Sequence, residues 1–286
     1  TILFLTVLAL FTFASTEAST VAPILTIHGI EDSCDFGIVN SLSEYFGTYA
    51  TCYEIGDFDP PAFSLFSINI QGSILCDEIH KNENLKNGNF SIMGISQGSV
   101  LAKYIIEYCP FENPVRSLVT FGGPNMGVSA TPSLPRETWI GYFLILIANH
   151  VFYWDIAQWL IAPADYWRDP QNVEGYLKYS KFLAEANNEV RFNQTRKDLW
   201  LSLKQCIFVK WEDDTVIIPR ESSWWGIETP DLTVIDRFDT DVYKNDLIGI
   251  RTLEESGRAD FIKIPGDHMH FSHHQINEIV AKAFEK

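Results

Sequence analysis

The pentapeptide Gly94-Ile95-Ser96-Gln97-Gly98 decides how this chain is interpreted, because it lies between two segments of different periodicity. Residues 90–93 form a short apolar run that predicts a buried strand, and residues 97–108 carry apolar side chains at helical spacing. The pattern G-x-S-x-G at such a junction predicts a sharp turn that exposes the serine hydroxyl, since the glycines let strand and helix approach closely. The pattern alone is a weak signal, and an ordinary glycine-rich turn is the alternative.

Strand-like and helix-like segments alternate on both sides of this turn. Short apolar runs are typical of buried parallel strands, and the segments between them repeat apolar residues at helical intervals. The predicted strands are residues 23–27, 49–55, 90–93, 117–121, 206–211 and 259–264. The predicted helices are residues 37–46, 66–79 and 97–108, and a closing helix with Ile276, Ile279, Val280 and Ala283 on one face. We therefore predict an α/β protein with a mostly parallel central sheet that helices cover on both faces.

The alternation breaks between residues 124 and 204, where no strand pattern is present. Within this stretch, residues 138–154 are uncharged and rich in aromatic side chains. This composition predicts a helical lid, inserted after the fourth strand at about residues 126–204, and not a continuation of the sheet. The chain from residue 19 to residue 286 is then a single domain enlarged by the insertion.

A serine in such a turn becomes a nucleophile only with a base and a carboxylate that orients the base. The acidic loop Glu212-Asp213-Asp214 follows one predicted strand, and Gly266-Asp267-His268 follows the last one. The order serine, aspartate, histidine, each after a strand, is typical of the α/β-hydrolase fold, in which these loops meet at one edge of the sheet. We predict Ser96, Asp214 and His268 as the catalytic residues. Local spacing favours Asp214, with Asp213 as the alternative.

Two backbone amides are predicted to bind the negative charge that develops on the substrate oxygen. One belongs to Gln97, directly after the nucleophile, and the other to Ile30, in the His28-Gly29-Ile30 turn after the first strand. The later residues His270, His273 and His274 are interpreted as solvated positions at the start of the closing helix. A metal cluster is the alternative, but no matching Asp or Cys spacing supports it. We predict neither a metal nor a cofactor.

Composition and charge exclude several classes of protein. The chain has 286 residues, of which 46% are hydrophobic and 14% aromatic, and this excludes intrinsic disorder. Its 37 acidic and 21 basic residues give a net charge of −16. Nucleic-acid binding is therefore not expected, because it depends on clustered basic side chains, and an anionic membrane would repel this surface.

Features near the N-terminus, the cysteines and two sequons indicate export. Residues 2–13 are an uncharged apolar run followed by small and polar residues, so we predict a secretory signal peptide over residues 1–18, with a buried helix or membrane anchor as the alternative. The five cysteines are an odd number, so at least one stays unpaired within the chain. The sequons at Asn89 and Asn193 predict N-glycosylation. Asn193 is the better candidate, because it lies in a polar stretch whereas Asn89 opens a predicted strand.

The chain resembles the palmitoyl-protein thioesterases over most of the predicted domain. The motifs that carry the resemblance are His28-Gly29-Ile30, Gly94-Ile95-Ser96-Gln97-Gly98, Gly122-Gly123-Pro124-Asn125-Met126-Gly127-Val128, Asp165-Tyr166-Trp167-Arg168-Asp169-Pro170, Asp213-Asp214-Thr215-Val216-Ile217-Ile218-Pro219, Ser222-Ser223-Trp224-Trp225-Gly226 and Gly266-Asp267-His268. The resemblance implies a lysosomal enzyme that removes long-chain fatty acyl groups from cysteine thioesters. It implies Ser96 as the nucleophile, His268 as the base and Asp214 as the acid. It also implies that the amides of Ile30 and Gln97 form the oxyanion hole.

The resemblance further implies that the insertion forms the groove for the acyl chain. The side chains that we expect to bind the acyl chain are Trp139, Phe143, Ile145, Phe152 and Trp159. An ordinary lid core and a membrane span are alternatives for this segment, but Asn149, His150 and Asp155 interrupt a span. The spacing of Cys76 and Cys109 resembles one disulfide of the family.

The expected reaction is hydrolysis of a long-chain acyl thioester through an acyl-serine intermediate. The substrate is an S-acylated protein or peptide, or acyl-coenzyme A, and the choice between these leaving groups stays open. A lipase or lysophospholipase acting on oxygen esters through the same three residues is one alternative, and a non-catalytic acyl-binding protein is another. We expect a monomer of the secretory pathway, in the lysosome or secreted, with no nucleic-acid partner and no stable membrane span.

Overall fold

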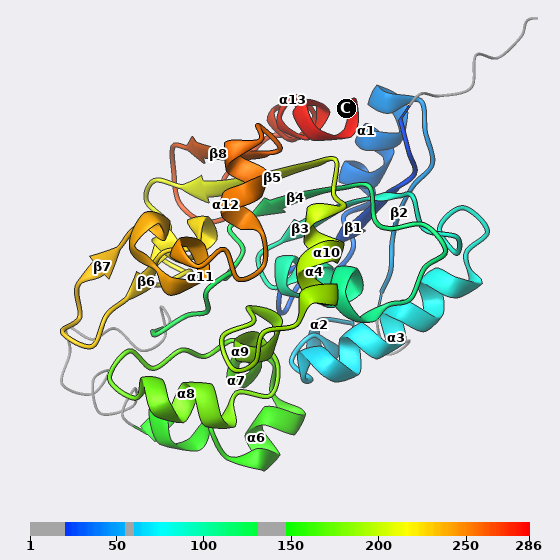
Figure 1. Cartoon of the computed structure of the whole chain (residues 1–286). Helices are drawn as coiled ribbons and strands as arrows, with labels where there is room; N and C mark the ends of the chain where they lie inside the picture. The colour runs from blue at the N-terminus through cyan, green and yellow to red at the C-terminus, as the bar shows by residue number, and fades with distance from the viewer. Residues whose placement is uncertain (1–20, 55–59, 131–146) are drawn as a thin grey trace, which may run out of the picture.

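A parallel sheet of six strands forms the centre of the computed structural model, which describes residues 21–54, 60–130 and 147–286. The strands lie in the order β2-β1-β3-β4-β5-β8 (Figure 1). Their bounds are β1 Ile24–Ile27, β2 Ala50–Cys52, β3 Ser91–Ile95, β4 Ser117–Phe121, β5 Gln205–Trp211 and β8 Ala259–Ile264. All six predicted strands are present. The predicted signal peptide, residues 1–18, lies outside the described residues.

Strand β2 is shorter than the predicted stretch 49–55. It is the edge strand among the described residues and pairs there with β1, with Ile24 opposite Ala50 and Thr26 opposite Cys52. Since β1 ends at Ile27, the ladder offers little further pairing beyond Cys52. The extent of this strand is therefore set by its neighbour and not by its own apolar pattern.

Helices cover both faces of the sheet, as the sequence predicts (Figure 1). Helices α1 (Phe36–Phe46) and α13 (His273–Phe284) lie on one face, and α3 (Ile68–Lys81) and α4 (Gly98–Tyr108) on the other. Neighbouring strand residues point to opposite faces, so Met93 packs in the cluster of α1 and α13 whereas Ile92 packs in that of α3 and α4. The central strands carry apolar side chains on both faces because both faces are buried. This architecture is the α/β-hydrolase fold.

The insertion between β4 and β5 is helical in its described part. Its helices are α6 (Asp155–Leu160), α7 (Ala162–Asp165), α8 (Val173–Tyr179), α9 (Leu183–Ala186) and α10 (Gln194–Leu201), preceded by a helical segment at 147–151. Helices α6 to α9 form a layer at one end of the sheet, whereas α10 returns to pack on α4 (Figure 1). Residues 147–204 contribute no strand to the sheet.

Short elements near the C-terminal half are not apparent from the sequence. Between β5 and β8 the chain forms a two-stranded hairpin, β6 (Ile227–Glu228) and β7 (Val234–Ile235), and the helices α11 (Asp241–Lys244) and α12 (Ile250–Glu255). Helix α2 (Pro60–Phe63) precedes α3. Elements this short do not complete a recognisable period, so hydrophobic patterning cannot predict them.

Four of the five cysteines are paired. Disulfides join Cys34 to Cys52 and Cys76 to Cys109, and the second is the pairing that the family resemblance implied. Cys206 is free and buried on β5. The odd cysteine is therefore a buried side chain of the sheet.

Over residues 21–54, 60–130 and 147–286, no helix combines the length and the apolar composition that crossing a bilayer requires.

Candidate active site

Ser96 occupies a strained turn between β3 and α4. Its backbone has φ +52°, a left-handed conformation that non-glycine residues seldom adopt, and its amide donates to Phe121 O at 2.8 Å. Gly98, two residues on, lies so close to β1 that a Cβ there would be 2.1 Å from Ile27 O. Only glycine fits this position, which explains the second glycine of the motif. The turn thereby brings Ser96 to the carboxyl end of the sheet, as the motif predicts.

The structure brings the three predicted catalytic side chains into one hydrogen-bonded row. His268 Nε2 lies 3.0 Å from Ser96 Oγ, and His268 Nδ1 lies 2.9 Å from Asp214 Oδ2. The other Asp214 oxygen accepts from the amides of Val216 and Ile217, each at 2.9 Å. The Asp214 side chain is fully buried, whereas its neighbour Asp213 is exposed. The geometry therefore pairs Asp214, and not Asp213, with the histidine.

The imidazole of His268 packs closely against neighbouring residues. The ring of Trp211, the last residue of β5, lies 5.2 Å from it, centroid to centroid. At Gly122, whose φ is +57°, a Cβ would come within 2.8 Å of His268 Cε1 and 2.5 Å of Trp211 Cζ3. Sequence reasoning did not assign a role to Trp211 or Gly122, although Gly122 opens a family motif. Their position at the ends of β5 and β4 is the signal that could have found them.

Asp267 connects the histidine loop to the acidic loop. Its carboxylate accepts from the backbone amide of His268 at 2.7 Å and from the amide and hydroxyl of Thr215 at 2.9 and 3.0 Å. These hydrogen bonds, first that from His268, lower the pKa of the Asp267 carboxyl. The two loops that carry Asp214 and His268 are thus linked directly to each other.

The turn after β1 lies against the serine. A Cβ on Gly29 would be 3.2 Å from Ser96 Cβ and 3.7 Å from Ser96 Oγ. Ile30, half-buried, follows Gly29 directly, and Gln97, which is buried, follows Ser96. The two residues predicted to supply oxyanion amides therefore belong to the two backbone turns that meet at the nucleophile.

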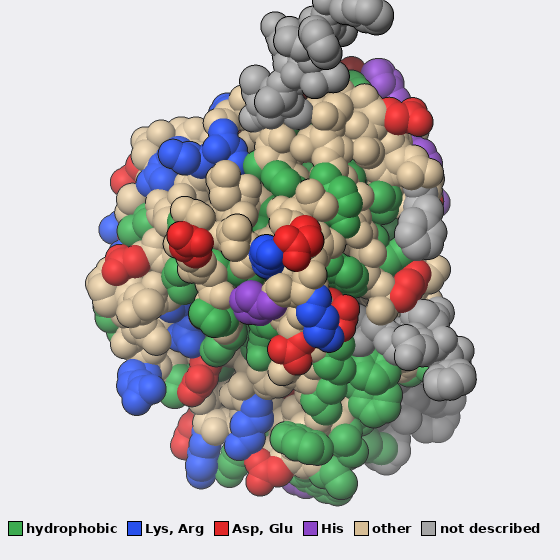
Figure 2. Space-filling model, turned by 90° about the vertical axis from the view of Figure 1, so that its right-hand side faces the viewer, with side chains coloured by type: hydrophobic (Ala, Val, Ile, Leu, Met, Phe, Trp, Pro, Cys, Tyr) green, Lys and Arg blue, Asp and Glu red, His purple; other side chains and the backbone are tan. Residues whose placement is uncertain are grey.

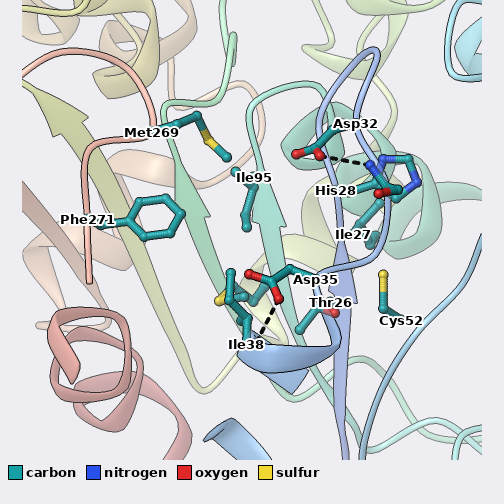
Figure 3. Close-up of a pocket in the computed structure, with 12 residues that line it drawn as sticks. Thr26, Ile27, His28, Asp32, Asp35, Ile38, Cys52, Ile95, Met269 and Phe271 are labelled. Carbon is teal, nitrogen blue, oxygen red and sulfur yellow. Dashed lines mark hydrogen bonds between the residues drawn. The ribbon is translucent and has the colours of Figure 1, made fainter. Parts of the chain in front are cut away.

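A cavity of about 240 Å³ adjoins this site (Figure 3). Ile95 and Met269, the chain neighbours of Ser96 and His268, point into it, together with Phe271. Asp32 and Asp35 line it from the loop before α1, and the described residues of its lining include no Lys or Arg. The cavity is thus apolar on one side and acidic on the other.

One group of described residues has metal-ligand types close together, His28, Cys34 and Glu54. Cys34 is bonded to Cys52, so it offers no thiolate to an ion. His28 Nδ1 instead lies 2.8 Å from Gly29 O, within the turn against Ser96. The exposed His273 and His274 lie 3.4 Å from Asp35 and Glu278, at the start of α13.

The residues predicted to bind the acyl chain are only partly described. Trp139, Phe143 and Ile145 lie outside the described residues. Phe152 packs edge-on against the buried Trp167 at 5.0 Å, and Trp159 on α6 is 69% exposed. Hydrophobic side chains gather on the lower part of the face in Figure 2. The acyl-binding role of Phe152 and Trp159 stays a prediction.

Both sequon asparagines are exposed. Asn89 lies two residues before β3, and Asn193 is the N-cap of α10, with its side-chain oxygen accepting from Arg196 N at 3.3 Å. A glycan is attached through the amide nitrogen, so the capping oxygen of Asn193 is left in place. Glycosylation of either residue stays a prediction.

A buried carboxyl anchors the lid to the domain. Asp165, at the end of α7, accepts from Ile68 N at the start of α3 at 2.6 Å, and its Oδ1 has no hydrogen-bond partner among the described residues. Burial raises the pKa of this carboxyl to about 8. The neutral form is therefore the one that fits the folded protein.

This carboxyl predicts a pH-dependent stability. In the unfolded chain the Asp pKa is about 3.9, so between roughly pH 4 and pH 8 the folded state binds the extra proton and stability falls as the pH rises. Glu107, whose burial raises its pKa to about 7, acts in the same direction. We expect Asp165→Asn to reduce the loss of unfolding free energy between pH 5 and pH 7.5 by up to about 3 kcal/mol. Urea unfolding at the two pH values measures it.

The exposed Asp198 on α10 provides the matched control. Asp198→Asn should keep the pH dependence of the wild type. An unchanged pH dependence in Asp165→Asn would show that Asp165 is ionised in the folded protein.

A family model and two similar proteins indicate one family. The sequence model described as palmitoyl protein thioesterase matches residues 23–268. Palmitoyl-protein thioesterase 1 of Caenorhabditis elegans is 32% identical over 296 residues, covering 99% of this chain and 98% of that protein. The lysosomal thioesterase PPT2 homolog of Drosophila melanogaster is 27% identical over 285 residues, covering 95% and 94%. Among solved structures, an extracellular α/β-hydrolase from a Paenibacillus species aligns with a TM-score of 0.48 at 13% identity, covering 93% of this chain and 100% of that chain.

Proposed function

This chain belongs to the palmitoyl protein thioesterase family, and from that membership we propose that it hydrolyses long-chain acyl thioesters of protein cysteines through Ser96, His268 and Asp214. The observation that carries the proposal is the row of hydrogen bonds from Ser96 Oγ through the imidazole to a buried carboxylate. Such a row is what a serine hydrolase needs, because the hydroxyl must lose its proton as it attacks.

The proposed reaction has two steps. Ser96 Oγ attacks the thioester carbonyl while His268 Nε2 takes the proton, and Asp214 keeps the proton of Nδ1 in place and stabilises the imidazolium. The amides of Ile30 and Gln97 bind the oxyanion, and the thiolate leaves readily because a thiol has a pKa of only about 8.5. The departing thiolate takes the proton from His268, which becomes a neutral base again. Water activated by His268 then releases the fatty acid from acyl-Ser96.

Charge favours a protein thiol over coenzyme A as the leaving group. The cavity beside Ser96 is lined by Asp32, Asp35 and His28. A third carboxylate lies near it, because Glu54 Oε2 is 3.9 Å from His28 Nε2. Coenzyme A carries several phosphate charges, which these carboxylates repel and which no Lys or Arg among the described lining residues offsets. A cysteine in a neutral or basic peptide meets no such repulsion. The acyl chain is proposed to lie along the lid, in contact with Phe152 and Trp159.

We propose that the protein works in the secretory pathway, in the lysosome. Two disulfides are typical of an oxidising compartment, and a relative from Drosophila melanogaster is named a lysosomal thioesterase. Asp165 and Glu107, whose burial raises their pKa values, each contribute to stability in the direction that favours the fold at acidic over neutral pH. Glycans on the exposed Asn89 and Asn193 would fit the same route.

A substrate panel tests this function. We expect the purified protein to cleave a palmitoyl-cysteine peptide with a higher kcat/KM than palmitoyl-coenzyme A or a matched palmitoyl oxygen ester, and to prefer palmitoyl over a short acyl chain. Liquid chromatography of the released fatty acid measures all four substrates in the same way, with Ser96→Ala as the blank.

Each other outcome contradicts one part of the proposal. Faster cleavage of the oxygen ester would favour a lipase or lysophospholipase, and faster cleavage of the coenzyme A thioester would exclude the leaving-group assignment. Equal rates for short and long chains would exclude an acyl groove. Release no faster than in Ser96→Ala would indicate a non-catalytic acyl-binding protein.

A further inference from the structure

Ser64, in the connection between α2 and α3, contacts both turns that meet at the nucleophile. Its side chain is buried, and its Oγ accepts from the backbone amide of Glu31 at 2.6 Å. Its carbonyl accepts from Gln97 Nε2 at 2.7 Å. Glu31 follows Ile30, and Gln97 follows Ser96, so one residue is bonded to both backbone segments that carry the proposed oxyanion amides.

The Glu31 contact matters because the backbone there is strained. Glu31 has φ +54°, a left-handed conformation that costs free energy in a residue other than glycine. Such a conformation persists only where surrounding contacts stabilise it. The hydrogen bond to Ser64 Oγ is the contact that the Glu31 amide makes, and it determines the orientation of the peptide next to Ile30.

The Gln97 contact belongs to a buried network. Gln97 Oε1 accepts from the hydroxyl of Tyr166 in the lid at 3.0 Å, so both ends of this buried amide are bonded. Gln71 on α3 also donates to Ser64 O, at 2.9 Å, and this second bond keeps the carbonyl in position. A buried side chain with all its polar atoms bonded is rigid, and its own backbone amide is held with it.

We propose that Ser64 is a positioning residue of the oxyanion hole, which sets the separation of the Ile30 and Gln97 amides by bonding to both turns. An oxyanion hole stabilises the transition state only if its donors are already in place, and one donor contributes roughly 10²- to 10³-fold in kcat. The proposal rests on the proposed function in taking Ser96 as the nucleophile and the amides of Ile30 and Gln97 as the oxyanion donors.

Removing the hydroxyl tests this role. In Ser64→Ala the Glu31 amide loses its acceptor while the Ser64 carbonyl stays, so we expect kcat to fall roughly 10- to 100-fold with KM nearly unchanged. We also expect the affinity for a palmityl trifluoromethyl ketone, which forms a tetrahedral adduct with a nucleophilic serine, to fall by the same factor. The affinity for palmitate, which forms none, should not change.

Ser67→Ala is the matched control. Ser67 is also buried, lies three residues away and caps α3 through Ile70 N, so this variant loses a structural hydroxyl without touching either turn. It should lower the unfolding free energy and leave kcat and ketone affinity intact. The proposal is wrong if Ser64→Ala lowers kcat no more than Ser67→Ala does, or if it weakens ketone and palmitate binding equally.

The same assay separates failure of this proposal from failure of the proposed function. Both variants are measured with a palmitoyl thioester and with a nitrophenyl palmitate. If the wild type cleaves only the nitrophenyl ester, the thioesterase function is wrong, and the ratio between Ser64→Ala and wild type on that ester still decides the role of Ser64.

Discussion

Ser96→Ala is expected to lower kcat/KM for a palmitoyl thioester by roughly 10⁵-fold or more. The variant removes the only atom that bonds to His268 Nε2 in the row of side chains, so no acyl-enzyme can form. The fold should be preserved, because alanine has the smaller side chain and the Ser96 amide still donates to Phe121 O. Circular dichroism and urea unfolding check the fold, and release of fatty acid checks the activity.

The exposed Ser202 at the end of α10 offers a matched control. Ser202→Ala removes a hydroxyl that donates to Leu199 O, far from the proposed chemistry, and should leave kcat/KM unchanged. If Ser96→Ala kept a tenth or more of the wild-type rate, another nucleophile or directly activated water would have to do the chemistry, and the proposed mechanism would be wrong.

Asp214→Asn is expected to lower kcat by roughly 10⁴-fold with little change in the unfolding free energy. The asparagine oxygen can still accept from Val216 N and Ile217 N, so the loop keeps its shape. Its amide nitrogen, however, takes the place of the oxygen that lies 2.9 Å from His268 Nδ1. A donor there favours the tautomer with the proton on Nε2, and that nitrogen can no longer take the proton of Ser96.

Asp213→Asn separates this effect from a simple loss of charge. Asp213 is adjacent in sequence and also acidic, but its side chain is exposed. The variant should keep at least half of the wild-type kcat. Steady-state kinetics of the two variants, with the pH profile of kcat/KM for each, decides between them. Equal losses in both would mean that general electrostatics near the site, and not the Asp214–His268 pair, supports the reaction.

Local pattern predicted the sheet well and the small elements poorly. The central strands β3, β4 and β5 are apolar on both faces because helices bury both, and that leaves an unmistakable run in the sequence. Strand β2 ends early because its partner β1 is itself short, and the hairpin β6–β7 is too short to show a period. Pairing between distant segments decides such cases, and a local window contains no information about it.

Within the proposed site, the residues with distinctive chemistry were predictable and their supporting residues were not. Ser96 and His268 follow strands in recognisable turns, but Trp211 and Ser64 belong to no motif, and the motif that Gly122 opens gave that residue no role. Trp211 matters because the imidazole packs on it, and Ser64 because two turns from elsewhere in the chain meet at it. Their roles arise from contacts, so only the folded arrangement reveals them.

The sequence by itself determined the alternation of strands and helices and the sharp serine turn, because each depends on residues close together in the chain. It also gave the order of the three side chains, each of which follows a predicted strand. Only the tertiary structure decided that Asp214 and not Asp213 pairs with His268, and that Ser64 joins the two turns at the nucleophile. His268 and Ser96 are 172 positions apart, and His268 and Asp214 are 54 apart. Distances of 3.0 and 2.9 Å between such residues result from the packing of the whole sheet and its helices, which no local periodicity specifies.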